Sequence, residues 1–419
     1  MRIVYVTTSL PYGAGEAFII PEVKELMRRG HDVLVVPRSP RGPVVHADAE
    51  PLLRCTLSQS LLSREVRKAA VTELKQNPDR ALKILRLLLR SRTPSITLKN
   101  LAVYCKGLWL ARVAREWRAA HIHAHWAAAT ATVALVASEV SGIPWSFTAH
   151  RFDIVDNNLL DIKVRSASFV RFISESGLDM ACSSGVNALA AKALVIHMGV
   201  IPPALKDSLP ERGPSVALCP GNLIPVKGHR YLIEAFAILK ARGIDAALWI
   251  AGQGELREQL KRQVEELGLG DRVRFLGQLS HADLLGLYEQ SKVGAVVLPS
   301  IDLGNGEHEG IPVALIEAMG YGVPVVSTAT GGISELLRGE AGLLVRAQDA
   351  LALANAIQRL MNDSGLRRRL SRAGRERVEA EFAQEQVTAE LLTHFERAGI
   401  VPSNAPDVET ACAAVGCLN

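Results

Sequence analysis

Residues 1–36 read MRIVYVTTSLPYGAGEAFIIPEVKELMRRGHDVLVV, and this stretch decides the expected fold. The apolar run at 3–8 predicts a strand, a loop with Gly13 and Gly15 follows, and residues 16–29 have the period of an amphipathic helix. Gly30 ends that helix, and residues 31–36 predict a second strand. This strand–helix–strand order predicts a parallel sheet with right-handed crossovers.

The same alternation continues along the chain and restarts after a proline-rich break at 202–214, which is typical of a linker. We therefore expect an α/β protein with two Rossmann-like, doubly wound domains whose ligands lie outside the carboxyl ends of the strands, in the cleft between the domains. The expected divisions are an N-terminal domain at 1–200, a C-terminal domain at 201–385, and a terminal helix and disordered tail at 386–419.

The composition is that of an ordinary globular enzyme. The 419 residues are 48% hydrophobic and 22% charged, and the six cysteines have neither metal-ligand nor disulfide spacing. No apolar run is long enough for a membrane span, and the first residues lack the apolar core of a signal peptide. These features predict a reduced, cytoplasmic protein.

Basic residues are concentrated between positions 54 and 118, a region that contains 15 Lys or Arg residues and four acidic residues. Within this region, which we expect to be a helical insertion at about 50–118, Lys83, Arg86 and Arg90 recur at helical spacing beside Leu and Ile. A basic amphipathic helix either lies on an anionic membrane face or packs on its domain with solvated cations. Aromatic residues are few and not interleaved with the basic ones, so nucleic acid is not an expected partner.

Two carboxylates, Glu309 and Glu317, bracket the sequence EGIPVALIE at 309–317. Pro312 suits the first helical position, so Glu309 should lie just before a helix start, where free N–H groups and the helix dipole favour a phosphate. In a wholly helical stretch the two carboxylates would be about 12 Å apart, which is comparable to the sugar-to-ribose span of a nucleotide-sugar. The plain alternative is a solvated helix face.

Other candidate residues follow predicted strands. Lys227, beyond the strand at 216–219, could place an ammonium on a diphosphate, or be an ordinary exposed lysine. Glycine turns follow at Gly252-x-Gly254 and at Gly331-Gly332, where a tight turn with positive φ is the structural alternative. His150 follows the strand at 144–148.

Three alternating histidines, His121, His123 and His125, would share one face of a strand. Three imidazoles could hold a zinc ion. However, successive histidines on one face of a strand are nearly 7 Å apart, roughly two rises of 3.3 Å, so the outer two rings cannot easily reach one ion. We therefore predict no metal site.

Residues 309–317 resemble the E-x7-E motif of the retaining glycosyltransferases of family 4, and the chain is similar to their bacterial exopolysaccharide and colanic-acid types. Lys227 matches the lysine of the family's G-R-L-x-x-x-K-G segment, where Asn222 replaces the arginine. Residues 147–153 resemble its H-G-x-D segment with Arg151 in place of Gly, and 330–335 resemble its G-G-x-x-E turn. Residues 122–125 are similar to a family segment that is not a metal site.

The resemblance implies a GT-B fold and a hexosyltransferase that retains anomeric configuration and moves a sugar from a UDP- or GDP-sugar to a saccharide. It implies that Glu309 holds the sugar hydroxyls, Glu317 the ribose, Lys227 the diphosphate, and that His150 contacts the sugar. The other implied donor-binding residues are Gly310, Ile311, Pro312, Asn222, Gly252, Gly254, Gly13 and Gly15. No cofactor or metal is implied.

The basic region adds the hypothesis of a lipid-linked acceptor at the cytoplasmic membrane face, in exopolysaccharide, capsule or lipopolysaccharide assembly. One alternative is an epimerase or a phosphorylase of the same fold, although no lysine stands out as the pyridoxal-phosphate site that a phosphorylase needs. Another is a non-catalytic nucleotide-sugar-binding or scaffold protein, which Asn222 and Arg151 favour.

Overall fold

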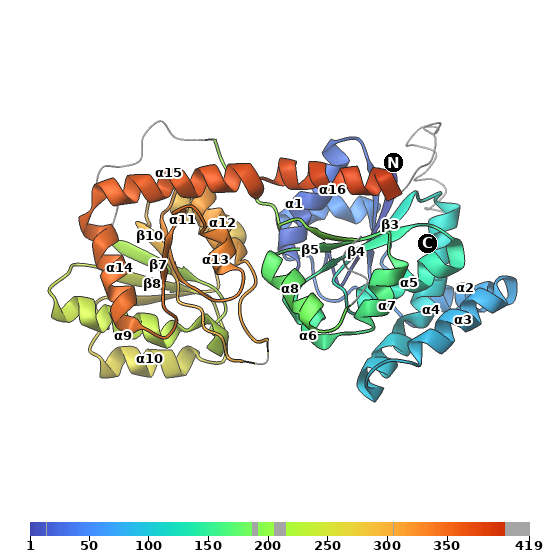
Figure 1. Ribbon diagram of the computed structural model, residues 1–419, viewed down its shortest axis with the longest axis horizontal. Coiled ribbons are helices and arrows are strands. Elements are labelled where there is room, and N and C mark those ends of the chain that lie inside the picture. Colours follow the sequence, from blue (N-terminus) through green and yellow to red (C-terminus); the bar gives the residue numbers. More distant parts are fainter. Residues whose placement is uncertain (14, 187–191, 205–214, 305, 399–419) are drawn as a thin grey trace. The chain divides into compact units, whose positions relative to one another are not determined.

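The structure is a computed structural model that describes residues 1–13, 15–186, 192–204, 215–304 and 306–398. The chain divides into two compact units, Met1–His197 with the segment from Val387, and Met198–Gln386. Each unit contains one six-stranded parallel sheet, so the predicted pair of doubly wound domains is confirmed (Figure 1).

The sheet of the first unit has the order β2-β1-β3-β4-β5-β6. Residues 3–6 of β1 pair with 33–36 of β2 on one side and with 121–124 of β3 on the other. The chain therefore reverses its winding direction between β1 and β3, and side chains just after these two strands share one edge of the sheet. The strands are β1 (Arg2–Thr7), β2 (Asp32–Pro37), β3 (His121–His125), β4 (Trp145–Ala149), β5 (Phe169–Phe172) and β6 (Ala193–Val195).

Helices cover both faces of this sheet. The helix predicted at 16–29 is divided into a 3-10 turn, η1, and the α-helix α1. Pro21 lies in the first turn of α1, where its missing N–H is not needed for a helical hydrogen bond. The helical elements are η1 (Ala17–Ile19), α1 (Ile20–Arg28), η2 (Ala47–Cys55), α2 (Arg64–Gln76), α3 (Pro78–Leu88), α4 (Pro94–Glu116), α5 (Ala129–Ser141), α6 (Arg151–Asp156), α7 (Leu160–Ser166), α8 (Glu175–Ser183) and α16 (Gln384–Ala398).

The basic region at 50–118 folds as a helical layer of the first unit. Helices α2 and α3 pack on α4, which in turn packs on α5. The apolar face of α3, formed by Ala81, Ile84 and Leu88, is buried in that layer, and Lys83 pairs with Glu139 of α5. The sequence allowed this helix either to lie on a membrane or to pack on its domain. The apolar face of α3 packs on the domain and is therefore not available to a membrane.

The sheet of the second unit has the order β12-β11-β10-β7-β8-β9, with its reversal between β7 and β10. Its strands are β7 (Val216–Pro220), β8 (Ala247–Ala251), β9 (Val273–Gly277), β10 (Ala295–Leu298), β11 (Val325–Thr328) and β12 (Leu343–Val345). Its helices are η3 (Pro225–Lys227), α9 (His229–Ala241), α10 (Arg257–Glu266), α11 (His281–Glu289), α12 (Val313–Gly320), α13 (Ile333–Leu336), α14 (Ala350–Asn362) and α15 (Ser364–Glu381).

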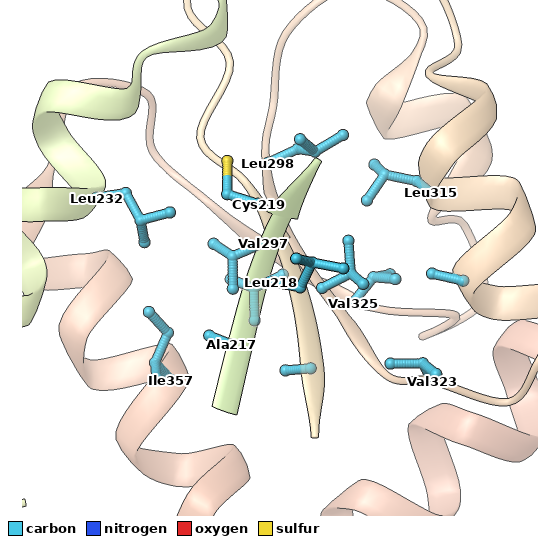
Figure 2. Packing of buried hydrophobic residues seen from close by; sticks show 14 of the residues in the cluster. Ala217, Leu218, Cys219, Leu232, Val297, Leu298, Leu315, Val323, Val325 and Ile357 are labelled. Atoms are coloured by element: carbon cyan, nitrogen blue, oxygen red, sulfur yellow. The ribbon is translucent and has the colours of Figure 1, made fainter. Parts of the chain in front are cut away.

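The core of the second unit fixes the central strands against helices on both sides. Figure 2 shows side chains of β7 and β10 between Leu232 of α9, Ile357 of α14 and Leu315 of α12, all of them fully buried. Because α12 is anchored by this packing, the loop before it has a defined position at the carboxyl end of β10. Among the described residues, no helix has the length and apolar character to cross a membrane.

Candidate functional site

Lys227 and Glu309 form an ion pair at the point where the second sheet reverses its winding. Lys227 ends η3, which follows β7, and Glu309 lies in the loop after β10, so both come from the carboxyl ends of adjacent strands. The Lys227 Nζ to Glu309 Oε1 distance is 2.8 Å, with side-chain exposures of 17% and 13%. The pair is therefore shielded but still reachable by a ligand.

Close backbone contacts hold the loops around this pair. Gly252 has a φ of +155°, and a Cβ on it would lie 1.9 Å from the Gly221 carbonyl oxygen. A Cβ on Gly254 would lie 2.4 Å from the Leu223 oxygen. These two glycines allow the loop after β8 to contact the loop that carries Lys227; the positive φ expected for a structural glycine holds for Gly252 but is not found at Gly254.

The second glycine turn does the same for Glu309. Gly331 has a φ of +50°, and a Cβ there would lie 1.8 Å from the Glu309 carbonyl oxygen. A Cβ on Gly332 would lie 2.7 Å from Ile311 Cγ1. The turn after β11 thus supports the 309–311 segment, and any larger residue would displace it.

Pro312 is not the first helical residue of α12, as predicted, but its N-cap. Its backbone is extended, with φ −71° and ψ 117°, and its carbonyl accepts the N–H of Leu315 at 3.0 Å. Since residues 309–312 precede the helix, the separation expected from a continuous helix does not apply. Glu309 and Gly310 nevertheless lie just before a helix N-terminus, where the first N–H groups have no partner within the helix.

Glu317 lies in the second turn of α12 and pairs with a residue that was not predicted. Its Oε1 is 2.6 Å from Nε2 of His281, the first residue of α11. Ser280, whose hydroxyl accepts the Asp283 N–H at 3.1 Å, is a recognisable N-cap that could have placed His281 at a helix start. Its contact with a carboxylate 36 residues away required the tertiary structure.

Asn222 is exposed, and its carbonyl accepts the Ile224 N–H at 2.9 Å. The amide supplies no charge at the position where the resembling family has arginine. Lys227 is therefore the cation that ion-pairs with Glu309 in the described part of the chain.

In the first unit, Gly13 lies in the loop after β1, and its N–H donates to the Pro43 carbonyl at 2.9 Å. The loop is organised by Glu16, which is 4% exposed. Its carboxylate accepts the N–H groups of Thr8, Ser9 and Leu10 at 2.9, 2.7 and 2.8 Å, and the Trp126 indole N–H at 2.7 Å. These four N–H groups are therefore already hydrogen-bonded within the first unit. Gly15 is exposed.

His150 lies at the N-cap of α6, directly after β4, with both ring nitrogens engaged inside the first unit. Its side chain accepts the Asp153 N–H in a capping box, and its Nε2 is 2.8 Å from Nε2 of His125. Burial lowers the pKa of His150 to about 3, so its imidazole is neutral.

The bond to His125 continues into a buried chain. Nδ1 of His125 lies 3.3 Å from the Tyr5 hydroxyl, which donates to the Glu22 carboxylate. Glu22 in turn pairs with Nη1 of Arg171 at 2.5 Å, and both side chains are fully buried. This chain holds the His150 ring through its nitrogens. The expected contact of His150 with a donor sugar remains a prediction, and it requires one of these bonds to be exchanged.

The other two histidines of β3 bind hydroxyl groups. His121 Nε2 is 2.7 Å from Ser146 Oγ, and His123 contacts Ser146 Oγ and Thr148 Oγ1 at 2.8 and 3.0 Å. Across the ranges that the structure describes, no group of three or more His, Cys, Asp or Glu side chains could hold a metal ion.

Comparison with known proteins gives a partial match in sequence. Residues 203–377 match the family described as glycosyl transferases group 1. The chain is 35% identical over 213 residues to the amylovoran biosynthesis glycosyltransferase AmsK of Erwinia amylovora, covering 50% of this chain and 51% of that protein. It is 36% identical over 176 residues to the putative colanic acid biosynthesis glycosyltransferase WcaL of Salmonella typhimurium, covering 41% and 42%. The chain thus spans about half the length of the curated relatives it matches.

Solved structures match almost the whole chain. HepE of Anabaena in complex with UDP superposes with a TM-score of 0.69 at 19% identity, covering 95% of this chain and 100% of that one. A sucrose-phosphate synthase from Thermosynechococcus elongatus gives 0.66 at 21% identity, covering 95% and 99%. These likenesses establish the fold: the protein has two parallel-sheet Rossmann-like domains of the GT-B class, and residues 203–377 of the second carry the group 1 glycosyl transferase sequence pattern.

Proposed function

We propose that this protein is a glycosyltransferase of polysaccharide biosynthesis that moves a sugar from a nucleotide-diphosphate sugar to a saccharide. The observation that carries the proposal is the Lys227–Glu309 pair at the winding reversal of the second sheet, just before the N-terminus of α12. Support comes from the family match over residues 203–377 and from relatives named as glycosyltransferases of amylovoran and colanic acid biosynthesis.

The pair suits a leaving diphosphate. A donor phosphate would compete with Glu309 for the Lys227 ammonium, and the N-terminus of α12 would add partial positive charge. Glu309, released from Lys227, would then accept hydrogen bonds from sugar hydroxyls, while Glu317 and His281 would bind the ribose. Positioning and charge stabilisation of this kind need no metal ion. Retention of anomeric configuration and hexosyl specificity are inferred from the family resemblance alone.

A uridine or guanosine diphosphate is the proposed donor nucleotide. HepE was solved with UDP-glucose, and a Corynebacterium glutamicum relative, 32% identical over 181 residues, is named as a GDP-mannose-dependent mannosyltransferase. A panel of UDP-, GDP-, ADP- and TDP-sugars, tested without added metal by thermal shift and by sugar release, would identify the donor.

The test of the site is Glu309→Ala. We expect transfer to fall by about 10²–10³-fold, which is typical when one transition-state contact is removed, with the fold retained and the melting temperature somewhat lower because Lys227 loses its partner. The matched control is Glu307→Ala, an exposed carboxylate in the same loop, which should turn over like wild type. Wild-type turnover by the Glu309 variant would end the assignment.

We further propose a lipid-linked acceptor presented at an anionic membrane face. Residues 80–115 contain nine Lys or Arg and no Asp or Glu. With Ala81, Ile84 and Leu88 of α3 buried, the exposed leucines near these cations are Leu82 of α3, Leu89 after α3 and Leu98 of α4, at 43%, 56% and 70% exposure. Leucine side chains beside a cationic surface suit binding at a lipid headgroup layer.

Vesicle flotation tests this acceptor proposal. The protein should float with anionic vesicles at low salt and be released at high salt, because screening weakens the basic contacts. Leu89→Ser with Leu98→Ser should reduce flotation, whereas Leu351→Ser, an exposed leucine of the second unit, should not. No flotation at low salt would refute the proposal.

A non-catalytic donor-binding or scaffold role is favoured by one observation, the exposed and uncharged Asn222 beside Lys227. It predicts nucleotide-sugar binding without turnover. A thermal shift that depends on Glu317 but is never accompanied by sugar release or transfer would support this second function over catalysis.

A further inference from the structure

Two loops lie together at the carboxyl edge of the first sheet. The segment after β2 is tied to the segment after β1 by backbone bonds, in which the N–H groups of Arg38 and Ser39 donate to the carbonyls of Thr7 and Thr8 at 2.8 and 2.9 Å. Further along, the Gly13 N–H donates to the Pro43 carbonyl at 2.9 Å. Arg38 and Arg41 are therefore held beside the winding reversal between β1 and β3.

Arg38 is a partly buried cation without a counter-ion. Its Nε is buried and has no hydrogen-bond partner, and within the described ranges its guanidinium makes no ion pair. Burial lowers the pKa of Arg38, Glu16 raises it, and Arg41 lowers it further. Leaving the Nε donor of a partly buried guanidinium without a hydrogen bond is costly to the folded state, and an anion bound there would offset that cost.

The carboxylate that raises the pKa of Arg38 is Glu16, and it does not fill this role. Glu16 acts on Arg38 electrostatically, but its oxygens already accept three backbone N–H groups, the Ser9 hydroxyl and the Trp126 indole N–H. Glu16 therefore moderates the positive charge without pairing with Arg38. Arg41 is exposed, so the cationic edge is open to solvent.

Several other cations in the described part of this unit have oxygen partners, including Arg2, whose Nε is also buried without a hydrogen bond but whose Nη1 donates to the Trp117 carbonyl at 3.1 Å. Arg171 pairs with Glu22 at 2.5 Å. Lys106 donates to the Pro37 carbonyl at 2.8 Å and to that of Gln59. Lys163 donates to the carbonyls of Ala127 and Ala128 at 2.7 and 2.8 Å. The fold of this unit thus provides oxygen acceptors for these three buried cations.

We propose that Arg38, together with Arg41, forms an oxyanion subsite that binds a phosphate or carboxylate group of the acceptor. A guanidinium presents paired N–H donors that match the oxygens of either group. This bidentate hydrogen bonding is strongest when water is partly excluded. Assignment of the anion to an acceptor rests on the proposed function, whereas the existence of the subsite does not. The substrate class is thus an anionic saccharide, either diphosphate-linked or containing a uronic acid.

Direct binding tests the subsite without any turnover. The full chain, held in a saturating concentration of UDP or GDP, whichever the donor panel identifies, is titrated by calorimetry with inorganic pyrophosphate, with glucuronate, and with glucose as the neutral control. We expect binding of at least one anion and none of glucose. Pyrophosphate binding indicates a phosphate-bearing acceptor, and glucuronate binding a uronate. Wild-type protein that binds neither anion overturns the proposal.

Variants separate a ligand site from a structural arginine. Arg38→Met keeps the aliphatic stem and should lose anion binding at least tenfold, with a melting temperature in anion-free buffer equal to or above wild type, because an unpaired cation has been removed. Exposed Arg41→Met should weaken binding without affecting the fold. Arg118→Met, an exposed arginine at the opposite edge of the sheet before β3, should bind as wild type does. Unchanged anion binding in both Arg38→Met and Arg41→Met overturns the proposal.

A kinetic experiment connects the subsite to transfer. With a charged acceptor, Arg38→Met should raise the acceptor KM about tenfold, equivalent to about 1.4 kcal/mol, while acceptor-independent donor hydrolysis and the donor KM stay the same. If the wild-type protein hydrolyses no nucleotide-sugar, the proposed function fails and the calorimetric result still decides the subsite. If hydrolysis proceeds but the acceptor KM does not change, the subsite does not serve the acceptor.

Discussion

At the scale of single residues, the site is a set of charges already paired with one another. Lys227 neutralises Glu309, and His281 contacts Glu317, so each carboxylate has a partner before any ligand binds. An unpaired carboxylate at 13% exposure would be costly in the unliganded protein, and a partner that a ligand can displace avoids that cost. Arg38, in contrast, has no such partner within the described residues.

The buried chain behind His150 allows a prediction about a single side chain. His125→Leu removes the hydrogen-bond partner of His150 Nε2 and leaves that ring nitrogen unsatisfied, which typically costs about 1–3 kcal/mol. If His150 contacts the donor, kcat should also fall, because its ring loses the bond that orients it. His125→Gln, whose amide can donate or accept a hydrogen bond, should restore kcat.

His121→Leu is the matched control, since His121 is buried on the same strand but bonds only to Ser146 in the described part of the chain. It should lose comparable stability, measured by urea unfolding, yet keep wild-type kcat. Equal kcat values for the His121 and His125 leucine variants would show that the chain has a structural role only.

At the scale of elements, the loops after β7, β8, β10 and β11 reach the site because glycines let their backbones touch. Gly252→Ala would place a methyl group 1.9 Å from the Gly221 oxygen, at a φ of +155° that alanine rarely adopts. We expect a loss of at least roughly 1–3 kcal/mol in urea unfolding and weaker donor binding, because the Lys227 loop must move.

Gly268→Ala provides the comparison for this loop effect. Gly268 also has a positive φ, +62°, but no atom lies within 4 Å of an added Cβ. It should lose stability through backbone strain while donor binding stays at the wild-type level. Unaltered donor binding in Gly252→Ala would show that its contact with Gly221 does not position Lys227.

At the scale of the whole molecule, buried ionisable groups make the stability of the first unit depend on pH. Lys106 of α4 bonds the carbonyls of Pro37 and Gln59, and burial lowers its pKa to about 7. The unfolded lysine titrates near 10.4, so between about pH 7 and 10 the unfolded state binds more protons than the folded one. Folding stability should therefore rise with pH by up to about 1.4 kcal/mol per unit.

Lys106→Met removes this proton linkage. The difference in unfolding free energy between wild type and variant, from urea titrations at pH 7, 8 and 9, should move in favour of wild type as pH rises. Parallel curves at all three pH values would mean that Lys106 keeps its charge in the folded state.

Most of the fold could be predicted from local patterns. Short apolar runs located strands in both sheets, although not β12, and the alternation of strands with helices predicted parallel pairing. Lys227 could also be selected because it follows a strand, and Glu309 because it precedes a predicted helix start in a segment that resembles the E-x7-E motif. Their ion pair was foreseeable only as proximity.

The remaining features depended on packing between distant segments. Pro312 became an N-cap once α12 was anchored in the core. The apolar face of α3 was buried by α4 and α5, and the unpartnered state of Arg38 arose from the use of Glu16 by other donors. The sequence by itself determined the order and type of elements, because those follow from short-range periodicity. Only the tertiary structure decided which polar groups found partners, because hydrogen bonds and ion pairs between remote residues depend on three-dimensional distances that no local pattern encodes.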